Sequence, residues 1–213
     1  MPGDGWTMRA CCARAAACAR VGGFVEPAEA VPNLAAVDAP IIAEGLPRPA
    51  REPRLTYHEA GHVVLGAALG ADVLGARVGG ADSASVHFPP GSPVSARVAM
   101  LVAGDIAGRW MDRTIWRPGD EELHWFHQRV REVDLGGCDS CRATFHIVTE
   151  DQRRTETEVF ARWRAIEAQT IAVAQRPDVW RSIKRVADTL LEQGELDGPT
   201  IRSLITCNAI EIH

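Results

Sequence analysis

The spacing of hydrophobic positions predicts a mostly helical chain. Apolar residues recur every three or four positions in residues 92–111, 152–175 and 177–193, as in helices that bury one face. A short final helix is predicted from Pro199, and the polar segment 112–137 is expected to be a loop followed by a helix.

A further helix is predicted at residues 57–69, within the stretch "LTYHEAGHVVLGAALG". Thr56 would be its N-cap, with Glu59 in the capping-box position three residues later, and Gly70 would end it.

Two short stretches, "DVLGARV" at 72–78 and "SASVHF" at 83–88, are separated by Gly79-Gly80 and Ala81-Asp82, which predicts a β-hairpin. In the helix at 92–111, Gly104 and Gly108 indicate close packing of the backbone against another helix. The expected fold class is therefore α+β, mostly α-helical, with one small sheet.

Residues 1–53 show no sustained helical or strand period. Their prolines recur too often for a long helix. They are Pro27, Pro32, Pro40, Pro47, Pro49 and Pro53. We expect a mostly disordered leader over 1–53 and one folded domain over 54–213.

Composition and charge exclude some classes of function. The formal net charge is −5, and no block of Lys and Arg forms a basic stripe, so no nucleic-acid binding is expected. No apolar run reaches about 18 residues, so no membrane segment is expected. Arg14 and Arg20 interrupt the Ala- and Cys-rich N-terminus, which lacks the apolar core of a signal peptide; this predicts a cytoplasmic protein. Its six cysteines are then expected to be thiols or metal ligands.

The candidate chemistry lies in the stretch "HEAGH". Positions i and i+4 share one face of a helix, so His58 and His62 can direct imidazole nitrogens at one point, about 2.0–2.1 Å from a zinc ion. Glu59 lies beside that point and can take a proton from a water that the metal activates, as the general base of a zinc peptidase does.

The same histidines and glutamate can also lie on an exposed helix face without any function. Ala60, Gly61, Val63 and Val64 oppose this alternative, because they describe a buried helix. Burying two histidines and a glutamate without a shared partner is costly, which favours a metal.

A catalytic zinc needs a third protein ligand and leaves one position for water and substrate. Spacing does not choose between three downstream candidates. They are Asp120, Glu121, His124 or His127 in "GDEELHWFH", Cys138 or Cys141 in "CDSC", and Asp139 between those cysteines. The cysteines also allow a redox pair or a separate zinc site, although a structural site normally needs four ligands. His87 and His146 are single histidines beside apolar residues and are expected at packed or edge positions.

The stretch "YHEAGHVVLGAALGADVLGARV" resembles the opening of the proteolytic domain of FtsH-type zinc metalloproteases. In that family the zinc-binding helix is followed by a strand and by a helix with a Leu-Leu-Gly-Gly/Ala-Gly pattern, where this chain has "VAMLVAGDIAG". "GGCDSCRAT" is similar to the family's segment for the third zinc ligand, with Asp139 at the aspartate. "RPDVWRSIKRVADTLLEQGELDGPTIRSLI" resembles its closing helix pair, so the resemblance spans residues 55–206.

The resemblance implies a zincin-like FtsH-type peptidase domain, with its small sheet beside the metal-binding helix. It implies Zn²⁺ held by His58, His62 and Asp139. With Glu59 as catalytic base, such a domain hydrolyses peptide bonds in unfolded or extended polypeptides. We expect the substrate to add as a strand at the edge of the 73–88 sheet.

The chain also departs from the family. We expect neither a transmembrane segment nor an ATPase module, because the sequence contains no long apolar run and no Gly-x-x-x-x-Gly-Lys-(Ser/Thr) phosphate loop. Gly108 stands where the family usually has an acidic residue, and the cysteines beside Asp139 are not part of its pattern. Besides the polypeptide substrate, the expected partner is a further copy of the chain or a separate ATPase. The alternative function is a non-catalytic FtsH-like module that binds a partner, which an intact Glu59 argues against.

Overall fold

The computed structural model describes residues 52–79, 83–111, 119–131 and 138–213. The expected leader at 1–53 lies outside the described residues as far as residue 51. Within the described ranges, no helix is both long and apolar enough to cross a membrane.

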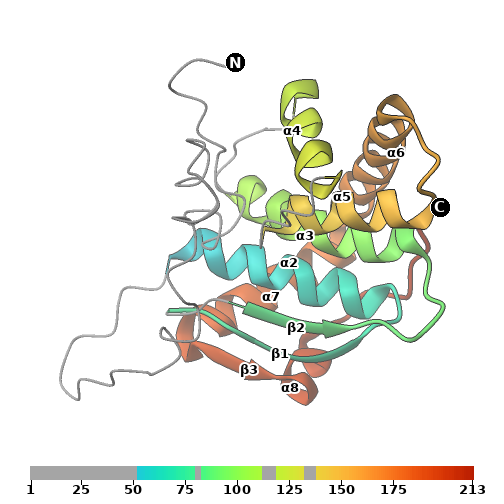
Figure 1. The fold of residues 1–213 in the computed structure, drawn as a ribbon. Coiled ribbons are helices and arrows are strands. Elements are labelled where there is room, and N and C mark those ends of the chain that lie inside the picture. The colour runs from blue at the N-terminus through green and yellow to red at the C-terminus, as the bar shows by residue number, and fades with distance from the viewer. Residues whose placement is uncertain (1–51, 80–82, 112–118, 132–137) are drawn as a thin grey trace, which may run out of the picture.

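The predicted α+β class, mostly α-helical with one small sheet, is confirmed for the described residues (Figure 1). The helices are α2 (Pro53–Ala68), α3 (Val94–Met111), α4 (Asp120–Arg131), α5 (Asp139–Glu150), α6 (Glu156–Ala174), α7 (Pro177–Gln193) and α8 (Gly198–Leu204). The strands are β1 (Asp72–Arg77), β2 (Ser83–His87) and β3 (Glu195–Asp197).

The sheet has the strand order β2-β1-β3, and both pairs are antiparallel. The predicted hairpin is the β1–β2 pair, with a register shift between Val73 and Gly75. Strand β3 is not among the predicted elements, because three residues with one buried side chain, Leu196, are too short to show an alternating pattern. Strand β2 is an edge strand, since in the described sheet it pairs only with β1.

Helix α2 begins earlier than predicted. Its first residue is Pro53 and its N-cap is Glu52. Proline suits this position, because the N–H that it lacks would have no partner within the helix. Thr56 is fully buried in the first turn, and its hydroxyl donates to the Pro53 carbonyl over 2.7 Å. The prediction of Thr56 as N-cap, with Glu59 in a capping box, is therefore wrong. Gly70 does follow the last turn, at φ 85°.

Two clusters of buried side chains form the core and meet along α3. The helical cluster fills the space between α3, α4, α5 and α6, and the sheet cluster lies between α2, the sheet, α7 and α8. From α3, Leu101 and Val102 belong to the helical cluster, whereas Ala103 and Ala107 belong to the sheet cluster. In Figure 1, α2 lies between the sheet and α3. Helix α2 is thus held from both sides.

Glycines allow α2 and α3 to approach closely. A Cβ atom on Gly61 would lie 2.5 Å from the carbonyl oxygen of Ala103, and one on Gly108 would lie 3.2 Å from the carbonyl oxygen of Arg54. A larger residue at Gly61 would force the two backbones apart, whereas a methyl group at Gly108 needs a shift of only a few tenths of an ångström. The predicted close packing at this face of α3 is confirmed.

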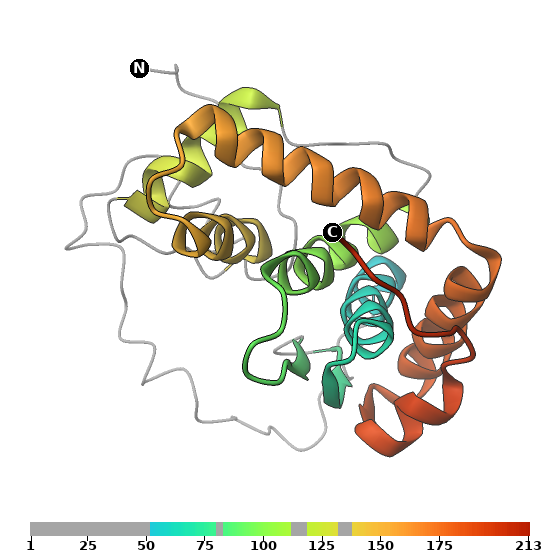
Figure 2. The same cartoon turned by 90° about the vertical axis from the view of Figure 1, so that its right-hand side faces the viewer.

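The C-terminal segment runs from α8 past α2 towards α6 (Figure 2). The N–H of Ile210 donates to the Ala68 carbonyl over 2.9 Å, and the Ser95 hydroxyl donates to the Ile212 carbonyl over 2.7 Å. The side chain of Ile212 is buried in the helical cluster. This segment therefore binds the last residue of α2 and the first turn of α3 by hydrogen bonds, and it packs on the core through Ile212.

Replacing Ile212 by Ala should lower the free energy of unfolding by about 2–4 kcal/mol, because it leaves a cavity in the helical cluster. Urea unfolding of the full chain measures this loss. Glu211→Ala is the matched control, since Glu211 is exposed and its loss should change the free energy by less than about 0.5 kcal/mol. Equal effects of the two changes would show that the segment does not pack on the core.

Candidate metal centre

His58, His62 and Asp139 meet between α2 and the start of α5. The Nε2 atoms of His58 and His62 are 2.9 Å apart. The Oδ2 atom of Asp139 lies 3.1 Å from Nε2 of His58 and 3.3 Å from Nε2 of His62. All three residues are at most 9% exposed. This buried group could hold a metal ion.

The triangle of ligand atoms has a suitable size for a small divalent ion. Atoms at about 2.0–2.1 Å from a tetrahedral zinc lie about 3.3–3.4 Å from one another. The observed separations run from 2.9 to 3.3 Å, so small shifts would complete the coordination. Two imidazoles and one carboxylate suit zinc and also other divalent transition metals.

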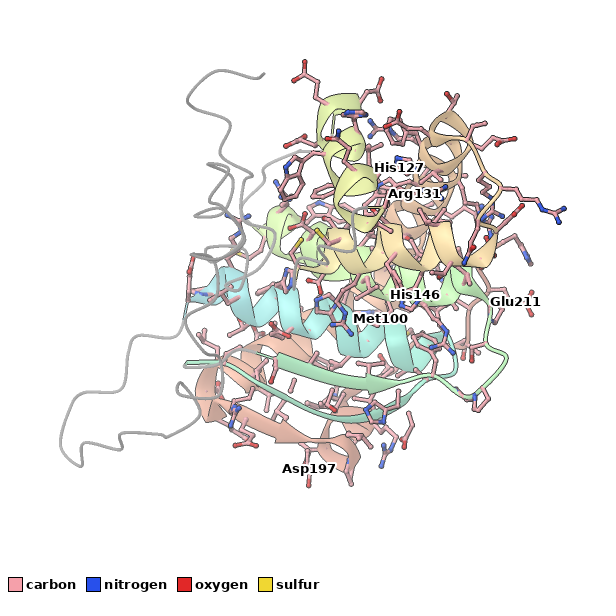
Figure 3. All side chains as sticks on the ribbon, in the orientation of Figure 1. Met100, His127, Arg131, His146, Asp197 and Glu211 are labelled. Atoms are coloured by element: carbon pink, nitrogen blue, oxygen red, sulfur yellow. The ribbon has the colours of Figure 1, made fainter. Side chains whose placement is uncertain are left out.

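A backbone carbonyl orients the ring of His62. Its Nδ1 lies 2.8 Å from the carbonyl oxygen of Met100. A carbonyl only accepts, so Nδ1 carries a hydrogen, and once a metal ion displaces the proton on Nε2, the lone pair of that atom is free to bind the ion. That lone pair faces the other two ligand atoms, as metal binding requires. Figure 3 shows Met100 between α2 and α5 in this view.

Gly104 of α3 makes room for both imidazoles. A Cβ atom at this position would lie 2.4 Å from Nε2 of His62 and 2.9 Å from Cε1 of His58. Any side chain here would displace the rings. The spacing of glycines in α3 indicated close packing, but it did not show that the neighbours are the imidazoles of His58 and His62.

The charges of the group favour a cation. Burial disfavours the charged form of His62, but the carboxylates of Asp139 and Glu59 and the carbonyl of Met100 outweigh it and raise the pKa of His62 to about 9. Burial also opposes ionisation of Asp139, yet the two histidines hold the pKa of its carboxyl well below the usual range. A divalent ion would supply the positive charge that this group attracts.

Glu59 lies on α2 between the two histidines and is 5% exposed. Its negative charge contributes to the raised pKa of His62. Glu59 is not a member of the three-residue group itself. A carboxylate beside the ligands rather than among them is the arrangement that a general base needs.

A second carboxylate, that of the partly buried Asp105 on α3, interacts electrostatically with the same group. It forms a 2.9 Å salt bridge with Arg109, one helical turn later. Burial raises the pKa of Asp105, while the positive charges of Arg109 and His58 oppose this rise. No role was predicted for this pair, and its i, i+4 spacing in "GDIAGR" was the only signal in the sequence.

The candidates in "GDEELHWFH" lie away from the ligand group. His124 and His127 of α4 both approach the carboxylate of Glu156, with 3.7 Å between Nδ1 of His127 and Oε1 of Glu156. Asp120 pairs with Arg164 over 3.2 Å. In Figure 3, His127 is far above Met100 on α4. These residues belong to the contact between α4 and α6.

The two cysteines of "CDSC" have a structural position. Cys138 is the N-cap of α5, and its sulfur accepts a hydrogen bond from the N–H of Cys141 over 3.5 Å. Both side chains are fully buried in the helical cluster. Neither joins the group that could hold a metal among the described residues. Of the three candidate third ligands, the structure brings Asp139 to the histidines.

Comparison of the chain with protein-family models and with curated proteins finds no match. The FtsH-type resemblance therefore rests on the sequence motifs alone.

Proposed function

We propose that the chain is a zinc-dependent metallopeptidase of the FtsH type, with a zincin-like fold, that hydrolyses peptide bonds in unfolded or extended polypeptides. One observation carries this proposal. His58 and Asp139, 81 residues apart in the sequence, meet at His62 with a buried Glu59 beside them. A structural zinc site normally has four protein ligands, whereas three ligands and a nearby carboxylate are typical of a catalytic site.

Each residue has its own task in the proposed reaction. His58, His62 and Asp139 would hold the ion, and its Lewis acidity would polarise the scissile carbonyl and ease deprotonation of a water molecule. Glu59 accepts a proton from the attacking water as the water oxygen bonds to the carbonyl carbon. The same carboxyl group then gives the proton to the leaving amine nitrogen while the C–N bond breaks.

The β2 edge of the described sheet is suited to binding an extended substrate. Strand β1 is paired on both sides, by β2 and β3, whereas β2 pairs only with β1 in the described sheet. An extended peptide can add to such an edge through main-chain hydrogen bonds. This mode of binding recognises backbone rather than folded shape, and so suits unfolded polypeptides.

Zinc content and hydrolysis should be lost together. We expect about one zinc ion per purified chain and hydrolysis of an unfolded, fluorescently labelled protein. His62→Ala removes a ligand and should abolish both, and a chelator should stop hydrolysis until zinc is returned. Elemental analysis and the initial rate measure the two quantities.

His124→Ala is the matched control for this experiment. It removes a histidine that pairs with Glu156 and tests the alternative ligand cluster on α4. Its zinc content and rate should equal those of the wild type. Undiminished hydrolysis by zinc-free protein would contradict the proposed function.

A further inference from the structure

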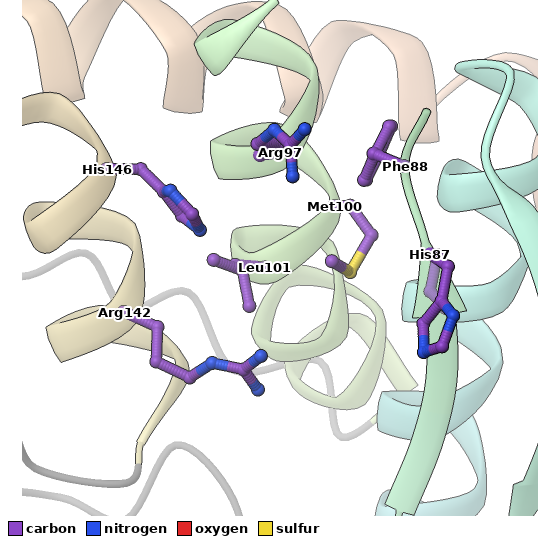
Figure 4. A pocket seen from close by; sticks show the side chains of 8 residues that line it. His87, Phe88, Arg97, Met100, Leu101, Arg142 and His146 are labelled. Carbon is purple, nitrogen blue, oxygen red and sulfur yellow. The ribbon is translucent and has the colours of Figure 1, made fainter. Parts of the chain in front are cut away.

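A cavity of about 320 Å³ opens between β2, α3 and α5 (Figure 4). Its apolar lining includes Val86 of β2, Phe88 just after that strand, and Met100 of α3. Its polar lining includes Arg97 of α3 together with Arg142 from α5. The cavity thus combines apolar walls with cationic side chains.

The cavity adjoins the proposed catalytic centre. Met100 lines it with its side chain and orients His62 with its carbonyl. Arg142 follows the ligand Asp139 by one turn of α5. The edge strand β2 forms another wall through Val86. A peptide that lies along β2 with its scissile bond at the metal would therefore place a neighbouring group in this cavity.

The charge of the lining is one-sided. Arg97 and Arg142 both face the cavity, and no Asp or Glu is among the described residues that line it. The guanidinium of Arg97 lies 5.5 Å from the centre of the Phe88 ring and donates to the Pro89 carbonyl over 3.3 Å, which holds it at the wall. In the part of the chain that the structure describes, Arg142 has no ion-pair partner.

His146, one turn beyond Arg142, adds a polar group to the same wall (Figure 4). Burial, and then the positive charges of Arg97 and Arg142, lower the pKa of His146. Its ring is therefore neutral near pH 7 and can exchange hydrogen bonds with a ligand, while the two arginines carry the charge.

We propose that this cavity is a substrate subsite that binds a carboxylate through Arg97 and Arg142, either the side chain of Asp or Glu or the C-terminal group of a peptide. Guanidinium groups pair with carboxylates through two parallel hydrogen bonds, which favours them over an ammonium group for this task. The apolar wall at Met100 and Phe88 receives the methylene groups of the same side chain. The inference rests on the proposed peptidase function.

Equilibrium binding tests the subsite without turnover. The protein is the full chain with Glu59→Gln, which should retain peptide without cleaving it, and the readout is fluorescence anisotropy. The probes are labelled eight-residue peptides of Ala and Val with an amidated C-terminus and Glu, Gln or Lys at one central position. A fourth peptide, with Gln at that position, has a free C-terminal carboxylate.

The Glu peptide, the free-carboxylate peptide or both should bind about tenfold more tightly than the amidated Gln peptide. Tighter binding of the Glu peptide assigns the subsite to an acidic side chain. Tighter binding of the free-carboxylate peptide assigns it to a chain terminus. Adding Arg142→Glu should abolish this preference and favour the Lys peptide. Arg185→Glu, an equal charge reversal at an exposed position of α7, should leave the preference unchanged.

Equal affinities for all four peptides, or the same preference with Arg142→Glu as with Arg185→Glu, would overturn the subsite. So would the absence of any measurable binding. Thermal unfolding of each variant shows whether it is folded, and Arg142→Lys should keep part of the preference. Hydrolysis by the wild type is measured separately. If the wild type is active but shows no preference for a carboxylate, only the subsite proposal is contradicted. If the wild type is inactive, the result counts against the peptidase function.

Discussion

Glu59→Gln is expected to slow hydrolysis strongly while the metal stays in place. The amide has the shape of the carboxylate but cannot accept the proton of the attacking water. General base catalysis contributes about 10²–10⁴-fold, so the rate at equal zinc occupancy should fall by that factor. Zinc should remain because Glu59 is not one of the three residues that could hold the ion. Initial rates on an unfolded, fluorescently labelled protein measure the effect.

Glu121→Gln is the control, since Glu121 is exposed on α4 and lies in the alternative ligand cluster. It should keep the wild-type rate and zinc content. If Glu59→Gln cleaves as fast as the wild type, the cleavage belongs to a contaminant or the site is silent. A non-catalytic module that binds a partner would then be the better account of the fold.

Gly104→Ala should lower the affinity for zinc by about 100-fold or more. Mutation of residues that contact and orient metal ligands typically lowers metal affinity by about 10–100-fold. The added methyl group would lie 2.4 Å from Nε2 of His62 and 2.6 Å from its Cε1. The ring can move away at small cost to the fold, because it is the end of a side chain. It cannot do so and keep its place among the ligand atoms.

The matched control is Gly108→Ala, one turn later on the same helix. Its Cβ would lie 3.2 Å from the Arg54 carbonyl oxygen and 3.5 Å from Cβ of His58, so it leaves the ring atoms of His58 in place. Both changes favour the helix equally, because alanine has the higher helix propensity. Competition with a fluorescent chelator measures the zinc affinities. Wild-type affinity in Gly104→Ala would show that zinc binds elsewhere.

Long amphipathic helices were the most predictable part of the fold. Helix α7 occupies residues 177–193 as predicted, because its apolar period is regular and Pro177 begins it. The start of α2 was missed because Pro53 ends a run of prolines that indicated a leader, although proline is equally suitable as a first helical residue. Strand β3 depends on pairing with β1, which no local pattern reveals.

The site was predictable where its residues are close in sequence. His58, Glu59 and His62 share one helical face, so their convergence follows from local geometry. For the third ligand, residue types left three candidates, and only the family resemblance singled out Asp139. The carboxylate-binding cavity could not be predicted, because Arg97 and Arg142 come from different helices and meet only through tertiary packing.

Because His58 and His62 lie on one side of the core and Asp139 lies on the other, a bound ion would also affect the order of folding. The residues around His58 and His62 on α2 pack in the sheet cluster, whereas those around Asp139 on α5 pack in the helical cluster. An ion bound to all three would link positions 81 residues apart. A covalent cross-link that closes a loop of such length stabilises the folded state by about 4–5 kcal/mol through the lost entropy of the unfolded chain. The binding site exists only once the two clusters have docked. Zinc uptake would therefore be a late event in folding, and it would report this docking rather than the formation of either cluster.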